Sequence, residues 1–314
     1  MKAKPPILRH LLSMQSLDRE KIIYLLNRAE FFLKAAVVKE ETLDTLRGKV
    51  VVNLFFEPST RTRCSFEIAT HRLGAILLSP DTKQSSMIKG EILIDTILNL
   101  EAMGAHLLIV RHADNHLAQF LAGESRAGVA VINAGDGSNE HPTQALIDLL
   151  TIRQHYPDFS HLTIAIVGDV IHSRVARSLA IGLHCMGVAR VRVIAPKEFS
   201  PTELAAMPFD LFHDMNAGLK GADVIYALRI QKERLKPNEQ PLKDDHYYQH
   251  FGLTKDRLTL AKQNAIVMHA GPIIRGVDIE SAVADGAQSV ILEQTRNSVA
   301  VRMAVMETLL LQGA

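Results

Sequence analysis

Residues 49–73 read KVVVNLFFEPSTRTRCSFEIATHRL, and this stretch decides the fold class. Residues 49–56 are mostly β-branched, aliphatic or aromatic, which is typical of a buried strand. From residue 59 onward, Phe66, Ala69 and Leu73 recur at the spacing of one helix face. A strand that leads directly into a helix is the unit from which parallel α/β sheets are built.

The same alternation continues along the chain. Further strand-like runs occupy residues 106–110, 129–133, 162–167, 191–194, 223–227, 265–269 and 289–292. Helical patterns occupy residues 143–153, 173–183 and 297–312. Strands that alternate with helices predict an α/β fold with two doubly wound parallel-sheet domains joined by helices. The 314 residues are enough for two such domains.

The expected domain boundary lies in a helix, because no Gly/Ser-rich linker is present. We place one domain at residues 1–142, completed by the C-terminal helical segment 297–314, and the second at residues 143–296. Ligands of open parallel sheets bind beyond the carboxyl ends of the strands. We therefore expect the active site in the crevice between the two domains.

Composition excludes several classes of protein. Lys and Arg number 35 against 34 Asp and Glu, so no large basic field exists to attract nucleic acid. No apolar run approaches the roughly 20 residues that span a bilayer, and the N-terminus lacks a signal-peptide pattern. Cys64 and Cys185 form neither a zinc spacing nor a disulfide framework. We expect a cytoplasmic enzyme with no metal, no membrane partner and no nucleic-acid partner.

The turn Phe56-Glu57-Pro58-Ser59-Thr60-Arg61-Thr62-Arg63 concentrates donors at a helix start. Ser59 can act as the N-cap, and the free backbone N–H groups, the helix dipole and Arg61 together suit an anion. Hydroxyl donors come from Ser59, Thr60 and Thr62. The alternative is a capped helix with solvated arginines, but the density of donors favours a phosphate site. The Walker A spacing is absent.

A second donor set follows the strand at residues 129–133. The Gly-rich loop NAGDGSNEHPTQ at residues 133–144 delivers His141 and Gln144 around a helix start, where Pro142 suits the first helical position. The imidazole can donate to a carbonyl oxygen, and the carboxamide oxygen can accept from an NH₂ group. A lone histidine is more often structural, but the Gly-rich loop and the glutamine favour a site.

Two pieces are ambiguous when taken alone. Ser85-Ser86-Met87-Ile88-Lys89-Gly90-Glu91 reads as an ordinary polar loop. Arg111, at the end of a strand, could clamp a phosphate with two hydrogen bonds or form a surface ion pair.

The second half offers three turns after strands. The turn VGDVIHSRVAR at residues 167–177 lacks the G-x-G-x-x-G glycines, which disfavours a nicotinamide cofactor, and it places Arg174 where it could reach a carboxylate. Arg229 and Gln231 alternate in an extended segment, so they point to one side. His269-Ala270-Gly271-Pro272 suggests a tight turn, with a cis bond as one possibility, that offers carbonyls to an NH₂ group.

Read together, S-T-R-T-R, H-P-T-Q, G-D-x-x-H-S-R-V and R-x-Q-K-E-R, in this order, resemble the aspartate/ornithine carbamoyltransferase family over residues 7–306. The resemblance implies transfer of the carbamoyl group of carbamoyl phosphate to an amine, without cofactor or metal. The neutral amine attacks the carbamoyl carbon, a tetrahedral intermediate forms, and phosphate leaves. Catalysis then depends on positioning and electrostatic stabilisation.

Three features resemble the aspartate branch, whose product is N-carbamoyl-L-aspartate for pyrimidine biosynthesis. Glu57 stands where the ornithine branch usually has lysine, the loop contains Lys89-Gly90-Glu91, and the last turn has no cysteine. Aspartate also carries two carboxylates that suit arginine and lysine. Ornithine or a related amine is the alternative substrate, and a non-catalytic family member is another reading. Ala270 stands where the aspartate branch generally has proline.

The resemblance also implies roles for individual residues. Carbamoyl phosphate would be bound by Ser59, Thr60, Arg61, Thr62, Ser85, Lys89, Arg111, His141, Gln144 and the carbonyls of Ala270 and Gly271. Aspartate would be bound by Lys89, Arg174, Arg229 and Gln231. The catalytic set would be Arg61, Thr62, Lys89, Arg111 and His141, with Glu57 orienting arginine side chains.

The assembly implied by the resemblance is a homotrimer with shared active sites. Ser85 and Lys89 would reach into the site of the neighbouring subunit. Such trimers work alone or with regulatory or dihydroorotase-like chains, and no motif in this sequence decides between these assemblies.

Overall fold

The computed structural model describes residues 6–82, 90–125, 128–202, 204, 208–235 and 242–311. The chain divides into two compact units. Unit 1 comprises Met1–Leu150 and Thr295–Ala314, and unit 2 comprises Thr151–Gln294. None of the helices in the described ranges combines the length and the apolar character needed to cross a membrane.

Unit 1 contains a four-stranded parallel sheet in the order β2-β1-β3-β4. Its strands are β1 (Val50–Phe55), β2 (Ile76–Leu78), β3 (Leu107–His112) and β4 (Ala130–Asp136). The sequence predicted β1, β3 and β4, whereas β2 went unpredicted because it is short and half exposed at the sheet edge. All four strands run the same way, so their carboxyl ends lie along one edge of the sheet.

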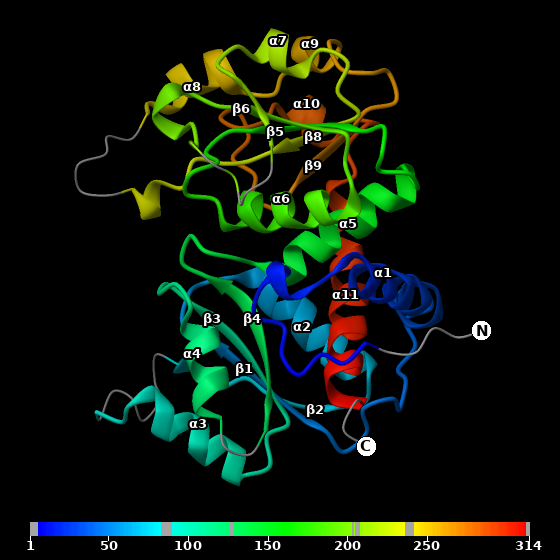
Figure 1. Cartoon of the computed structure of the whole chain (residues 1–314), viewed down its shortest axis with the longest axis vertical. Coiled ribbons are helices and arrows are strands. Elements are labelled where there is room, and N and C mark those ends of the chain that lie inside the picture. The colour runs from blue at the N-terminus through cyan, green and yellow to red at the C-terminus, as the bar shows by residue number, and fades with distance from the viewer. Residues whose placement is uncertain are drawn as a thin grey trace. The chain divides into compact units, whose positions relative to one another are not determined.

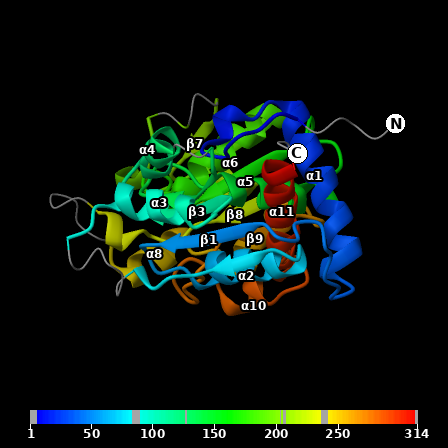
Figure 2. The same cartoon turned by 90° about the horizontal axis from the view of Figure 1, so that it is seen from below.

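Helices cover both faces of this sheet (Figures 1 and 2). On one face lie α3 (Leu93–Ala102) and α4 (Leu117–Glu124). Their apolar side chains pack against a buried cluster that includes Val52, Leu108 and Val131 of the strands. On the other face lie α2 (Thr60–Arg72) and α11 (Ile291–Leu311), with α1 (Arg19–Phe32) beyond α11. This layering is the doubly wound arrangement that the alternating pattern predicted.

A buried arginine of α11 packs against α2. The guanidinium carbon of Arg302 lies 4.7 Å from the centroid of the Phe66 ring, and Phe66 belongs to the predicted buried face of α2. Burial lowers the pKa of Arg302 to about 9. Arg28 of α1 reaches the same helix through two charged hydrogen bonds to Glu307. These contacts hold the long C-terminal helix against the first helices of the chain.

Unit 2 contains a five-stranded parallel sheet in the order β7-β6-β5-β8-β9. Its strands are β5 (Thr163–Val167), β6 (Arg190–Ile194), β7 (Asp210–Phe212), β8 (Val224–Ala227) and β9 (Ile266–His269). Only β7 was not predicted, and it is a short edge strand with exposed side chains. One face carries α6 (Arg174–Met186). The other carries α7 (Met215–Leu219), α8 (Asp244–Phe251), α9 (Lys255–Leu258) and α10 (Ser281–Ala284).

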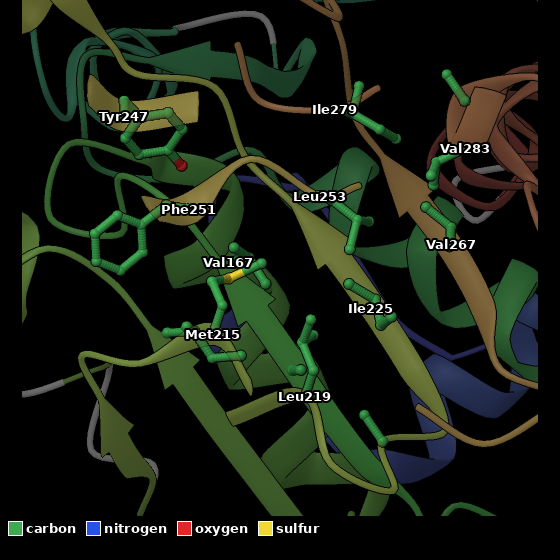
Figure 3. Close-up of a cluster of buried hydrophobic side chains, with 14 of the residues drawn as sticks. Val167, Met215, Leu219, Ile225, Tyr247, Phe251, Leu253, Val267, Ile279 and Val283 are labelled. Atoms are coloured by element: carbon green, nitrogen blue, oxygen red, sulfur yellow. The ribbon is translucent and has the colours of Figure 1, made fainter. Parts of the chain in front are cut away.

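The core of unit 2 lies between the sheet and the second set of helices. Figure 3 shows Val167, Ile225 and Val267 projecting from neighbouring strands toward the helices. Side chains from the helices and loops meet them: Met215, Leu219, Tyr247, Phe251, Leu253, Ile279 and Val283. These contacts fix the central strands of the sheet, from whose carboxyl ends the loops leave.

One predicted strand is wrong. Residues 289–292 do not form a strand, because α11 already begins at Ile291. Ser289 makes only an isolated bridge to Val267, and the N–H of Gln294 donates to the carbonyl of Val290 at the helix start. A short apolar run that precedes a helix reads equally well as a strand or as the first helical turn.

Ile225 tests the importance of the unit 2 core. Replacement with alanine removes buried methylene groups at the centre of the sheet, so the free energy of unfolding of unit 2 should fall by about 2–5 kcal/mol. Urea unfolding followed by circular dichroism measures the change. The control is Leu292→Ala, because Leu292 is 83% exposed and its truncation should change stability by less than about 0.5 kcal/mol. Equal effects of the two substitutions would contradict this assignment of the core.

Candidate active site

Three neighbouring strands of unit 1 end beside one another, and each leads into a segment predicted to bind substrate. Phe55 of β1 pairs with Arg111 of β3, and His112 of β3 pairs with Asp136 of β4. The N–H of Phe56 donates to the carbonyl of Arg111 at 2.9 Å. The structure therefore brings the start of α2, Arg111 and the loop that precedes His141 to the same edge of the sheet.

The start of α2 has the geometry of an anion site. Ser59 occupies the N-cap position with extended backbone, as predicted, and its carbonyl accepts the N–H of Arg63 at 3.1 Å. Its hydroxyl makes no capping hydrogen bond, so this side chain does not close the helix end. Thr60 and Arg61 are exposed, whereas Thr62 is buried. A helix end directs N–H groups and a positive dipole toward an anion.

Arg111 is held in place by two neighbouring groups. Its Nη1 donates to the carbonyl of Ala134 at 3.1 Å, and its Nε lies 3.5 Å from the carboxylate of Glu57. The side chain is only 13% exposed. Glu57 thus lies beside an arginine at the end of β3, which fits the orienting role that the resemblance implies. A guanidinium held this way needs little reorganisation to bind an anion.

The loop that follows β4 folds around one buried carboxylate, that of Asp136. Oδ1 accepts from the side chain of Asn133 at 2.8 Å and from the N–H of Glu140 at 3.0 Å. Oδ2 accepts from the N–H of His116 at 2.6 Å and from the side chain of Asn139 at 2.9 Å. Asp136 therefore sets the path of the chain that leads to α5.

His141 lies at the end of this loop, immediately before α5 (Pro142–His155). Pro142 is the first residue of the helix, as predicted. The side chain of His141 is buried, and its carbonyl accepts the N–H of Gln144 at 2.9 Å. The preceding residue, Glu140, accepts the N–H of Met14 at 2.8 Å, which ties the N-terminal segment to the loop. His141 thus sits at a rigid junction.

Gln144 has a fixed amide orientation. Its Nε2 donates to Oδ1 of Asp148 at 2.9 Å, and Asp148 is fully buried one helical turn further along α5. Because a carboxylate can only accept, the NH₂ end of the amide must face Asp148 and the oxygen must face away from it. An outward oxygen is the acceptor that the predicted contact with a carbamoyl NH₂ group requires.

In unit 2, a second buried carboxylate joins two strand-end loops. Asp169 follows β5, and its Oδ1 accepts the N–H of His172 at 3.2 Å. Its Oδ2 accepts the N–H of Gln231 at 3.0 Å. Gln231 belongs to the loop after β8. Gly168, with φ +123°, permits this approach, because a Cβ atom there would lie 2.5 Å from the carbonyl oxygen of Leu228.

The arginines predicted to bind aspartate flank these loops. Arg174 is the first residue of α6, its side chain is buried, and the preceding Ser173 caps the helix. Arg229 forms two hydrogen bonds with the carboxylate of Glu233, one of 2.9 Å between Nη1 and Oε2 and the other between Nη2 and Oε1. These bonds lower the pKa of Glu233. Nη1 also donates to the carbonyl of Ile230 at 3.1 Å. The N–H donors that these bonds do not use, one on Nε and one on Nη2, can bind a second carboxylate.

The turn after β9 carries Ala270 and Gly271, whose carbonyls are the predicted acceptors. The Gly271–Pro272 peptide bond is cis, the form considered for it from the sequence, and Gly271 has φ +70°. Both Ala270 and Gly271 are half-buried.

Two predicted site residues, Ser85 and Lys89, lie outside the described residues. The other predicted residues fall into two groups. Those for carbamoyl phosphate lie in unit 1, apart from Ala270 and Gly271, and those for aspartate lie in unit 2.

The sequence-based reading missed the residues that position these groups, namely Asp136, Glu140, Asp148, Asp169 and Asp278. All are carboxylates, and all are buried. Most lie at or shortly after a strand end, and an acidic residue beside an apolar run is the signal that could have found them.

The two halves of the chain match two different domain models of one protein family. Residues 9–154 match the model of the aspartate/ornithine carbamoyltransferase carbamoyl-P binding domain, and residues 160–309 match that of the Asp/Orn binding domain. The chain is 50% identical over 303 residues to an aspartate carbamoyltransferase catalytic subunit of Coxiella burnetii, covering 96% of both proteins.

Solved structures agree with these matches. Aspartate transcarbamoylase from Trypanosoma cruzi, in complex with carbamoyl phosphate and aspartate, has a TM-score of 0.83 and 27% identity over 96% of this chain and 95% of that one. Ornithine carbamoyltransferase from Thermus thermophilus has a TM-score of 0.84 and 27% identity over 97% and 100%. Fold likeness alone thus does not separate the two activities. Two matched domain models that span both halves show that the chain belongs to the aspartate/ornithine carbamoyltransferase family.

Proposed function

We propose that this chain transfers the carbamoyl group of carbamoyl phosphate to the amino group of L-aspartate, giving N-carbamoyl-L-aspartate and phosphate. The observation that carries the choice of aspartate is Arg229, whose guanidinium is fixed by Glu233 and Ile230 and keeps one N–H on Nε and one on Nη2 for the second carboxylate of aspartate. The relative with 50% identity is an aspartate carbamoyltransferase, which supports the same choice.

The phosphate of the first substrate would bind at the start of α2. Ser59, Thr60 and Thr62 supply hydroxyl donors, Arg61 supplies a full positive charge, and the helix end supplies N–H groups. Arg111, held by Ala134 and Glu57, would bridge the phosphate and the carbamoyl oxygen. As phosphate leaves, negative charge grows on oxygen atoms that these donors already face, so they stabilise the transition state more than the substrate.

The carbamoyl group itself would be held from both of its ends. His141 and Thr62 would donate to the carbonyl oxygen, which becomes more negative as the amine attacks. The oxygen of Gln144, turned outward by Asp148, would accept from the carbamoyl NH₂ group. The carbonyls of Ala270 and Gly271 would accept from the same NH₂ group. Such contacts fix the plane of the carbamoyl group relative to the attacking nitrogen.

Aspartate would be bound by Arg174, Arg229 and Gln231 together with Lys89. The two carboxylates of aspartate pair with cations, which leaves the neutral amine to attack the carbamoyl carbon. The tetrahedral intermediate then collapses as the C–O bond to phosphate breaks, and the proton lost by the amine leaves with the phosphate. Ornithine carries a second amine instead of the second carboxylate. An amine would be repelled by the positive charge of Arg229, so the electrostatics disfavour ornithine.

The proposed assembly is a homotrimer in which Ser85 and Lys89 of one subunit complete the site of the next. We further propose that the enzyme works in the cytoplasm, in pyrimidine biosynthesis, either as a bare trimer or with regulatory or dihydroorotase-like chains. The relative from Coxiella burnetii is called a catalytic subunit, which is consistent with an assembly of more than one chain.

Substrate choice is tested with the purified chain, carbamoyl phosphate and either L-aspartate or L-ornithine, with the ureido product measured by colour formation. Product should form with aspartate and not with ornithine. The matched variant Arg229→Ala should lose activity toward aspartate by about 10²- to 10³-fold. Turnover of ornithine by the unaltered chain would contradict the proposal, and so would activity with neither amine by a chain that circular dichroism shows to be folded.

A shared site is tested by mixing two inactive variants, Arg61→Ala and Lys89→Ala. Each hybrid trimer would contain one site with both residues intact, whichever variant is in the majority. Dissociation and reassembly of an equal mixture should therefore restore about a quarter of the original activity. Each variant reassembled alone is the control and should stay inactive. An inactive mixture, in which mass spectrometry detects hybrid trimers, would show that the site is not shared in this way.

A further inference from the structure

In the turn at residues 269–274 the ring of Pro272 restricts the φ angle of that residue, but the two carbonyls proposed to bind substrate belong to Ala270 and Gly271 before it. Ala270 has no ring to restrict its φ angle, and Gly271 adopts the left-handed region at φ +70° without side-chain contacts to hold it there. The proposed reaction nevertheless needs the carbonyls of Ala270 and Gly271 at fixed positions. Hydrogen bonds from the surroundings are therefore an important restraint on Ala270 and Gly271.

Both nitrogens of the His269 ring are used in such bonds. Nδ1 lies 2.7 Å from the backbone nitrogen of Gly271, whose N–H can only donate. Nδ1 must therefore accept and carry no proton, which places the ring proton on Nε2. Nε2 lies 2.7 Å from Oδ2 of Asp278 and donates to it. The network thus selects one neutral tautomer of His269.

Asp278 holds the far end of the same turn. Its carboxylate accepts the N–H of Ile274, at 3.0 Å to Oδ1 and 3.2 Å to Oδ2. The backbone N–H of His269 donates to Oε1 of Gln294 at 3.1 Å, which fixes the near end. Residues on both sides of Ala270 and Gly271 are thereby joined to one buried pair, since His269 is 4% and Asp278 1% exposed.

A paired aspartate and histidine also suggest general base catalysis, but this arrangement cannot supply it. A general base needs a ring nitrogen with a free lone pair that faces the substrate. Here the lone pair of Nδ1 is used by Gly271, and the other nitrogen carries its proton toward Asp278. The pair is thus equipped to hold backbone in place and not to move a proton.

We propose that His269 and Asp278 are positioning residues that hold the carbonyls of Ala270 and Gly271 toward the carbamoyl NH₂ group. This inference rests on the function proposed above and adds two residues to it. The acceptor at Nδ1 is the decisive atom, because it alone joins the ring to the segment that carries the carbonyls.

Three substitutions at His269 separate this role from simple packing. Asparagine places an acceptor near the position of Nδ1 and can still bind the N–H of Gly271. Glutamine extends to the position of Nε2 and can still reach Asp278, but it leaves Gly271 without an acceptor. Alanine removes both bonds. Packing alone would favour glutamine over asparagine because glutamine fills more of the volume of histidine.

The measurements are kcat and both KM values with carbamoyl phosphate and aspartate, together with the melting temperature of each variant. His269→Gln and His269→Ala should lose roughly 10²-fold in kcat, whereas His269→Asn should lose less than about tenfold. KM should rise for carbamoyl phosphate and stay nearly constant for aspartate. The control is His161→Asn, because His161 has 88% of its side chain exposed and lies outside the site.

Two outcomes would overturn the inference. If His269→Gln were the most active variant, followed by His269→Asn and then His269→Ala, the role of His269 would be to fill volume. The same conclusion would follow if the losses of kcat were proportional to the losses of melting temperature. Failure of the proposed function itself is distinguishable, since it would show as an unaltered chain without activity in the same assay.

Discussion

The structure depends on buried carboxylates that hold the loops at the carboxyl ends of parallel strands. A strand that ends leaves backbone N–H groups without partners in the sheet, and such groups are costly to bury unpaired. Asp136 accepts them in the loop after β4, Asp169 joins the loops after β5 and β8, and Asp278 closes the turn after β9. These loops and the helices that follow them carry residues proposed to bind substrate, namely His141, Gln144, Arg174, Arg229 and Gln231.

Two other carboxylates, Glu57 and Glu233, lie beside arginines that are proposed to bind substrate. Substrates with phosphate and carboxylate groups require several arginines, and these would repel one another if they were unpaired. Arg111 lies beside Glu57, and Arg229 binds Glu233, so each guanidinium has a carboxylate that partly balances its charge and orients it. Negative charge thus serves two purposes here, since it satisfies backbone donors in the loops and fixes arginines in place.

The sequence predicted the architecture because the central strands have strong apolar patterns and the helices have regular faces. It did not predict β2 and β7, which are three-residue edge strands, and it misread residues 289–292, whose apolar run starts a helix. Local motifs also identified Arg111, His141, Gln144 and Arg229 as candidates. Asp136, Asp148 and Asp278 accept hydrogen bonds mostly from residues three to nine positions away, and Asp136 also accepts from His116, 20 positions away. No single motif records those contacts.

The central claim is that the residues of unit 1 proposed to bind phosphate and the residues of unit 2 proposed to bind carboxylate act on the same reaction. Calorimetric titration with N-(phosphonacetyl)-L-aspartate, a ligand in one of the Trypanosoma cruzi structures, tests it most directly. Arg61→Ala and Arg229→Ala should each weaken binding by roughly 2–5 kcal/mol, whereas binding of inorganic phosphate should weaken only in Arg61→Ala. Unchanged affinity for N-(phosphonacetyl)-L-aspartate in Arg229→Ala would contradict the account.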